Sequence, residues 1–194
     1  PIMAGFIALA DVFIPVYLGE GFEKSAELMK IFAPIIVLVG MANIVGVSFL
    51  IPINKQNVYL VSVVAAAAVN LCLNFILIPG FYSVGAAISS VIAEFISICI
   101  QFIYIFRKKL LNAKNVFLPA IKYTIAGIIM FAAIDLLKLL LPVNVSALLL
   151  LIAAGVIIYF AILLLLRDEF LMEFIRKFFS AIHARLRNSN HEKQ

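Results

Sequence analysis

Long uninterrupted apolar runs are the feature that most limits what this sequence can fold into. Apolar residues make up 65% of the 194-residue chain and charged residues only 13%, against roughly half and roughly a quarter in soluble domains. Runs of about 18 residues or more recur along nearly the whole length, and each can cross the ~30 Å hydrocarbon core of a bilayer as a helix. The sequence therefore predicts an all-α integral membrane protein.

The runs divide into six predicted transmembrane helices. Prolines and glycines fall near their ends, where both residue types are tolerated. The predicted spans are 1–18, 31–51, 58–79, 84–106, 119–141 and 147–166. The tail that follows is too polar to span, but apolar residues recur in it at helical spacing, which predicts an amphipathic helix along the membrane interface. These apolar positions are Leu171, Ile175, Phe178, Ile182 and Leu186.

We expect three parts in the chain. Residues 1–106 would form a four-span core, 107–166 two additional peripheral spans, and 167–194 a basic cytoplasmic tail. The run 147–166 has almost no polar face, so we expect lipid on all its sides. The chain opens without an initiator methionine or a basic leader, so we expect it to be the C-terminal part of a longer protein with a truncated first span.

Basic residues predict the orientation of the spans, because lysine and arginine concentrate on cytoplasmic connections. The connection from Arg107 to Lys114 holds four of them, and the tail from Arg167 is also basic. Both segments, and with them the C-terminus, are expected in the cytoplasm. Since the net charge of +5 is confined to places beside apolar spans, it predicts contact with anionic lipid and not with nucleic acid.

Two predicted spans carry polar side chains inside the hydrocarbon. An amide or carboxyl group without a partner is costly there, so each stripe should face another helix or a wet cavity. The stripes consist of Ser62, Asn70 and Asn74 in span 58–79, and of Ser90, Glu94, Ser97 and Gln101 in span 84–106. Successive members lie three, four or eight residues apart, which places each stripe on one side of a helix.

Ionisable residues within the spans point to function by default. Glu94 is the strongest candidate for a functional role among them. The alternative is a purely structural role, as a glutamic acid that is hydrogen-bonded to a neighbouring helix such as the one with the asparagine stripe. Asp11 in the first span is the second. Asp135 and Lys138 lie three residues apart on a helix and are expected to pair with each other.

Small residues four apart predict close helix packing: Ala42 with Gly46, and Gly85 with Ser89. Asn43 lies in the same segment, where the glycines favour either tight packing or a hinge. The sequence has no catalytic triad, metal-ligand spacing or nucleotide-binding motif, so we expect no enzyme activity, metal or cofactor.

Two segments carry a resemblance to a known family. One is G-x-x-F-x-x-S from Gly19 to Ser25; the other is N-x-x-x-N…I-P-x-x-x-x-x-G-A-A from Asn70 to Ala87. Together with the turn at Lys55 and Gln56, they make residues 1–106 similar to the C-terminal lobe of bacterial polysaccharide flippases. These flippases belong to the multidrug/oligosaccharidyl-lipid/polysaccharide exporter superfamily. The rest of the chain resembles them only in hydropathy.

The resemblance implies two lobes around a central cavity, so that the missing N-terminal lobe would be a partner. The activity implied is movement of a polyprenyl-diphosphate glycan to the outer leaflet of the bacterial cytoplasmic membrane by alternating access. Membrane lipid and the glycan polymerase machinery are further implied partners. The candidate cavity residues are Asn43, Ser62, Asn70, Asn74, Ser90, Glu94, Ser97 and Gln101.

The resemblance also raises the question of charged ligands. Glu94 or Asp11 would bind a coupling ion. A diphosphate requires cations, and here Arg107, Lys108 and Lys109 would either hold it at the cytoplasmic mouth or only anchor the topology.

Two other functions stay open. A drug or organic-cation antiporter of the same superfamily would use Glu94 as its cation-binding carboxylate. A membrane glycan polymerase or ligase would need a large outer loop with arginines and acids, which the short outside connections lack.

Overall fold

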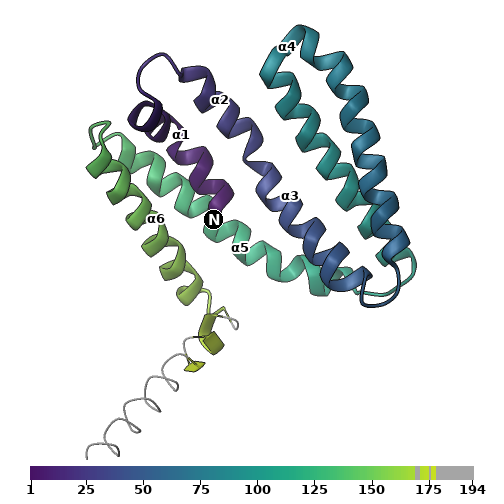
Figure 1. Ribbon diagram of the computed structural model, residues 1–194. Coiled ribbons are helices and arrows are strands. Elements are labelled where there is room, and N and C mark those ends of the chain that lie inside the picture. The colour runs from purple at the N-terminus through teal and green to yellow at the C-terminus, as the bar shows by residue number, and fades with distance from the viewer. Residues whose placement is uncertain (169–170, 175, 178–194) are drawn as a thin grey trace, which may run out of the picture.

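The computed structural model describes residues 1–168, 171–174 and 176–177 (Figure 1). All regular elements in these residues are helices, which confirms the all-α prediction. In chain order they are α1 (Ile2–Leu18), α2 (Glu23–Phe32), α3 (Pro34–Asn43), the π-helix η1 (Ile44–Leu50), α4 (Gln56–Arg107), α5 (Ala113–Lys138) and α6 (Val145–Leu165).

In the described part of the chain, four helical stretches are long and apolar enough to cross a membrane. They are Glu23–Leu50, Gln56–Arg107, Val116–Lys138 and Val145–Leu165. α1 is apolar but shorter. These helices characterise a multi-pass membrane protein. The count of six spans stays a prediction, because it requires α1 and both halves of α4 to cross separately.

The predicted span 31–51 is built from consecutive helical segments of different kinds. α2 ends at Phe32 and Pro34 opens α3, as expected for a residue whose fixed φ suits a first helical turn. From Ile44 the helix widens into the π-helix η1, a rare form that often lies at functional sites. The segment where glycines favoured either packing or a hinge thus contains a change of helix type.

α4 folds back on itself at Tyr82 and forms two antiparallel arms (Figure 1). Tyr82 has φ 49° and ψ −126°, a strained conformation for a residue with a side chain. Gly85 lets the arms approach, since a Cβ there would lie 2.6 Å from the carbonyl oxygen of Leu77. The arms correspond to the predicted spans 58–79 and 84–106.

Three apolar cores hold the described helices together, and the smallest packs Ala10 and Ile14 of α1 against Ala26 of α2. Of the two larger cores, one joins α3, η1 and α4 around Leu50 and Ile105. The other joins α1, α5 and α6 around Val12, Ile134 and Leu151. α1 therefore shares a core with the two helices that we expected to be peripheral, while the proposed domain boundary at residue 106 remains untested.

α6 corrects one expectation. We expected lipid on all its sides, but a stripe with a spacing of four is buried: Leu151, Gly155, Tyr159 and Leu163. Gly155 lies against Ile134 of α5. The expectation was wrong because a face that packs on a helix and a face that meets lipid tails are equally apolar.

The predicted amphipathic tail falls largely outside the described residues. Leu171–Phe174 is helical, and the backbone N–H of Leu171 donates to Asp168 Oδ1 at 3.0 Å, in the manner of an N-terminal cap. Of the predicted apolar positions, Ile175, Phe178, Ile182 and Leu186 lie outside the described residues.

Replacing Gly85 by alanine should destabilise the protein by about 1–3 kcal/mol, the usual cost of overpacking. The added methyl group would meet the backbone of Leu77, which cannot rotate away. Thermal unfolding of the detergent-purified protein measures the effect. The matched control is Gly127→Ala in α5, which has no neighbouring atom within 4 Å and should be neutral or stabilising. Equal shifts for both variants would refute the close approach of the arms.

Candidate functional site

A groove of about 670 Å³ lies between α3 and the two arms of α4. Alanines in its lining, such as Ala66 and Ala93, leave room for it. Its polar lining consists of Asn43, Tyr59, Asn70, Ser90, Glu94 and Ser97. Five of the eight candidate cavity residues therefore line this groove. Tyr59, the sixth polar residue of the lining, was not among the candidates.

The asparagine stripe is part of a hydrogen-bonded chain that crosses between the arms. Asn74 Nδ2 donates to Asn70 Oδ1 at 2.9 Å, and Asn70 Nδ2 donates to Ser90 Oγ at 3.3 Å. Asn74 does not line the groove; it orients Asn70, which does. The pairing satisfies both polar atoms of the Asn70 side chain and the Nδ2 of Asn74, whereas Asn74 Oδ1 is buried without a hydrogen-bond partner in the described residues.

A second polar cluster lies between the arms. Gln101 Nε2 donates to Ser62 Oγ at 3.0 Å, and Ser97 Oγ donates to the same oxygen at 3.4 Å. Ser62 and Gln101 are fully buried and are not part of the groove lining, whereas Ser97 belongs to both. The hydrogen bond between Ser62 and Gln101 therefore links the two arms of α4 and does not face the groove.

Glu94 is half-buried on the wall of the groove. Among the described residues, no side chain hydrogen-bonds or ion-pairs with its carboxylate. The expected alternative, a hydrogen bond to the asparagine stripe, is therefore not formed in this structure. The side chain of Glu94 thus lines the groove together with the hydroxyl and amide groups of its neighbours.

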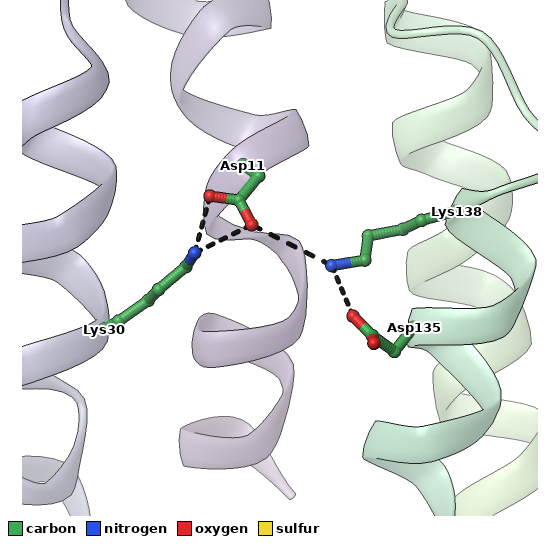
Figure 2. A network of polar contacts seen from close by, with 4 residues as sticks. All are labelled: Asp11, Lys30, Asp135 and Lys138. Atoms are coloured by element: carbon green, nitrogen blue, oxygen red, sulfur yellow. Dashed lines mark hydrogen bonds and ion pairs between the residues drawn. The ribbon is translucent and has the colours of Figure 1, made fainter.

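Asp11, the other candidate for ion coupling, belongs to a network of four charged residues away from the groove (Figure 2). Lys30 Nζ lies 2.6 Å from Asp11 Oδ1 and 2.8 Å from Oδ2. Lys138 Nζ lies 2.7 Å from Asp135 Oδ1 and 4.0 Å from Asp11 Oδ2. The network ties α1 to α2 and α5.

The predicted pair of Asp135 and Lys138 is confirmed. Sequence reasoning missed Lys30, because its pairing with Asp11 depends on which helices are neighbours. Helical spacing predicts contacts within one helix only. In this structure Asp11 is therefore held by lysines, whereas Glu94 is not.

Arg107, Lys108 and Lys109 are exposed at the end of α4 and lie outside the groove lining. The turn before α4, the connection from α4 to α5 and the end of α6 lie toward one end of the molecule (Figure 1). The helix ends next to Lys55, Arg107 and Arg167 therefore lie toward the same side of the molecule. Such clustering is what the predicted cytoplasmic orientation requires.

Comparison with known proteins gives one partial match. Over 102 residues the chain is 24% identical to a protein of Escherichia coli (strain K12) with the name "Putative O-antigen transporter". The chain is similar to a transporter. The matched segment covers 53% of this chain and 25% of that transporter, so the chain spans much less than the length of this relative. No protein-family model and no solved structure matches the chain.

Water-soluble thiol reagents should distinguish the groove from the space between the arms. In a background with Cys72→Ala and Cys99→Ala, we expect Glu94→Cys to react with a membrane-impermeant maleimide and Ser62→Cys to stay unmodified. The reason is that Glu94 lines the hollow while Ser62 has no exposed surface. Mass spectrometry of the labelled protein measures both. Modification of position 62 but not 94 would contradict the described groove.

The charge network should show energetic coupling between Lys30 and Asp11. Lys30→Met and Asp11→Asn, made singly and together, are expected to be non-additive by up to about 1 kcal/mol, because both side chains remain partly exposed. Thermal unfolding of the four proteins gives the coupling. Lys24→Met combined with Asp11→Asn is the control, since Lys24 has no ion pair in the described residues. Strict additivity for Lys30 would mean that the contact contributes nothing.

Proposed function

We propose that this chain forms the C-terminal lobe of a flippase that moves a lipid-linked glycan from the inner to the outer leaflet. The observation that carries this proposal is the groove, where amide, hydroxyl and carboxylate groups gather inside a strongly apolar bundle. Polar groups at membrane depth are retained where they line a path for a polar solute.

The chemistry of the groove suits a carbohydrate. Asparagine and serine side chains both donate and accept hydrogen bonds, as sugar hydroxyl groups do. Asn70 is oriented by Asn74 and Ser90, so its position is fixed before a ligand arrives. The lipid tail of the substrate would remain in the bilayer while the sugar and diphosphate cross.

The similarity to the protein of Escherichia coli (strain K12) named "Putative O-antigen transporter" supports the same class of cargo. We further propose that the transported substrate is a glycan linked to a polyprenyl diphosphate. The proposed mechanism also includes alternating access between two lobes, the second lobe being supplied by the rest of a longer protein. The protein would lie in the bacterial cytoplasmic membrane with its C-terminus in the cytoplasm, near the glycan polymerase machinery.

The diphosphate sets a requirement that this groove does not meet. Its described lining contains no lysine or arginine, whereas phosphate binding in proteins relies on such cations. We therefore assign the diphosphate to cations of the second lobe or, during entry, to Arg107, Lys108 and Lys109. The sugar chain is the part of the substrate that this groove would hold.

A second candidate function rests on Glu94. A carboxylate without a protein partner in a membrane groove also suits a cation-coupled antiporter for organic cations. In that case Glu94 would bind the cation directly, and resistance to cationic dyes would depend on it. A glycan polymerase or ligase remains the less favoured reading of the sequence.

Vesicle assays of leaflet exposure test the proposal. With the full-length protein reconstituted, we expect a lipid-linked glycan to become accessible from the opposite leaflet, and Glu94→Gln to slow this by about 10–100-fold. This range corresponds to the loss of a hydrogen bond to a charged group. Asn70→Leu with Asn74→Leu should abolish exposure without preventing membrane insertion.

The matched control is Glu27→Gln, the same chemical change at an exposed position of α2 outside the groove. It should leave glycan exposure unchanged. If the wild-type protein adds no exposure but confers dye resistance that Glu94→Gln removes, the antiporter replaces the flippase.

A further inference from the structure

A second hollow, of about 420 Å³, lies between α2 and the second arm of α4. α2 contributes Ser25, Leu28, Met29 and Phe32, and α4 contributes Ser83, Ala86, Ala87 and Ser90. All of these side chains are uncharged. The small residues of α4 leave space opposite the larger apolar residues of α2.

This hollow adjoins the groove already described, because Phe32 and Ser90 line both. Along the second arm of α4, the joint path runs from Ser97 to Ser83. At 1.5 Å per residue this corresponds to about 21 Å of helix, a large part of the ~30 Å hydrocarbon core. The path leads toward the fold-back of α4, away from the basic end of the molecule (Figure 1).

Both segments that the sequence analysis singled out end in this hollow. The first ends at Ser25, and the second ends at Ala86 and Ala87. They are about 60 residues apart in the chain, yet their ends face each other across one space. Neither end takes part in the groove's polar lining, so the groove alone does not account for them.

The hydroxyl groups of Ser25 and Ser83 are available to a ligand. Within the described part of the chain, neither side chain has a hydrogen-bond partner. Ser89 and Ser90 differ, because their hydroxyls donate to backbone carbonyl groups of their own helix. Two free hydroxyls above an apolar wall match a sugar, which presents hydroxyl groups at its rim and C–H groups on its faces.

The absence of charged side chains from the described lining of the hollow further restricts the class of ligand that fits. A diphosphate or an organic cation needs a charged partner, and burying one without it is costly. An uncharged sugar needs only hydrogen bonds and apolar contact, the usual composition of a small-molecule pocket. Phe32, at the junction with the groove, offers an aromatic face for the same contact.

We propose that this hollow binds uncharged sugar units of the glycan that lie beyond those held in the groove. The inference rests on the proposed flippase function and specifies where the distal part of the sugar chain sits. It follows that substrates with longer sugar chains depend on the hollow, while a substrate with a single sugar does not reach it.

The test compares two synthetic polyprenyl-diphosphate lipids in vesicles with the full-length protein, one carrying a single sugar and one an oligosaccharide. Ser25→Leu with Ser83→Leu should slow exposure of the oligosaccharide lipid about tenfold, as expected from losing two neutral hydrogen bonds. The single-sugar lipid should move at the wild-type rate. Ser25→Thr with Ser83→Thr keeps both hydroxyls and should retain transport of both lipids.

Other outcomes overturn the proposal. Equal slowing of both lipids by the leucine variant, or slowing of neither, would mean that the hollow does not distinguish sugar chains. If the leucine variant is not recovered folded, Ser25→Ala with Ser83→Ala serves instead, with the same expected contrast. The hollow must also be open to a ligand, which a water-soluble maleimide tests on the variants Ser25→Cys and Ser83→Cys. If neither thiol reacts in transport-active protein, other parts of the protein cover the hollow and the proposal is wrong. Failure of the flippase itself is distinct, because the wild type would then move neither lipid.

Discussion

The two arms of α4 are held together by hydrogen bonds for which lipid offers no substitute. Gln101 and Ser97 donate to Ser62, and Asn70 donates to Ser90. An amide facing hydrocarbon without a partner would be costly, so the arms gain stability only in a register that pairs these groups. That register also brings Asn70 and Glu94 to the same groove. The position of the groove thus depends on the hydrogen bonds that the polar side chains of α4 form between its two arms.

The four residues of the charge network lie apart from the neutral polar groups of the groove. Most of the neutral polar groups that line the groove or pair across the arms lie on α4, and Asn43 is contributed by α3. Asp11, Lys30, Asp135 and Lys138 pair with one another on the other helices. Glu94 is the one acidic or basic residue in the described lining of the groove, where its neighbours are neutral. Because of this separation, the groove presents neutral hydrogen-bonding groups together with the single carboxyl group of Glu94.

Sequence periodicity predicted as much of the site as one helix can specify. Residues three or four apart share a helix face, so the stripe through Asn70 and the stripe through Glu94 could each be found. Periodicity did not distinguish Ser62 and Gln101, which lie between the arms, from Ser90 and Glu94, which line the groove. That difference depends on how the two arms are rotated against each other.

Contacts between separate helices were harder to predict. The pair of Lys30 and Asp11 joins residues 19 positions apart, and nothing in the spacing indicates it. The buried face of α6 went unrecognised because Leu151 and the lipid-facing leucines are chemically alike. The glycines near Asn43 favoured either tight packing or a hinge, but the π-helix depends on backbone geometry that composition does not determine.

The charge network has a consequence for the electrical work that a movement of these helices requires. Two carboxylates and two ammonium groups carry no net charge together, so a movement that displaces all four as a unit does no electrical work. Displacing a single elementary charge across 100 mV changes the free energy by about 2.3 kcal/mol. Among the described residues of the groove, Glu94 has no cation beside it to cancel its charge. Among the described residues that line the groove, Glu94 is therefore the one acidic or basic side chain whose movement would displace a net charge.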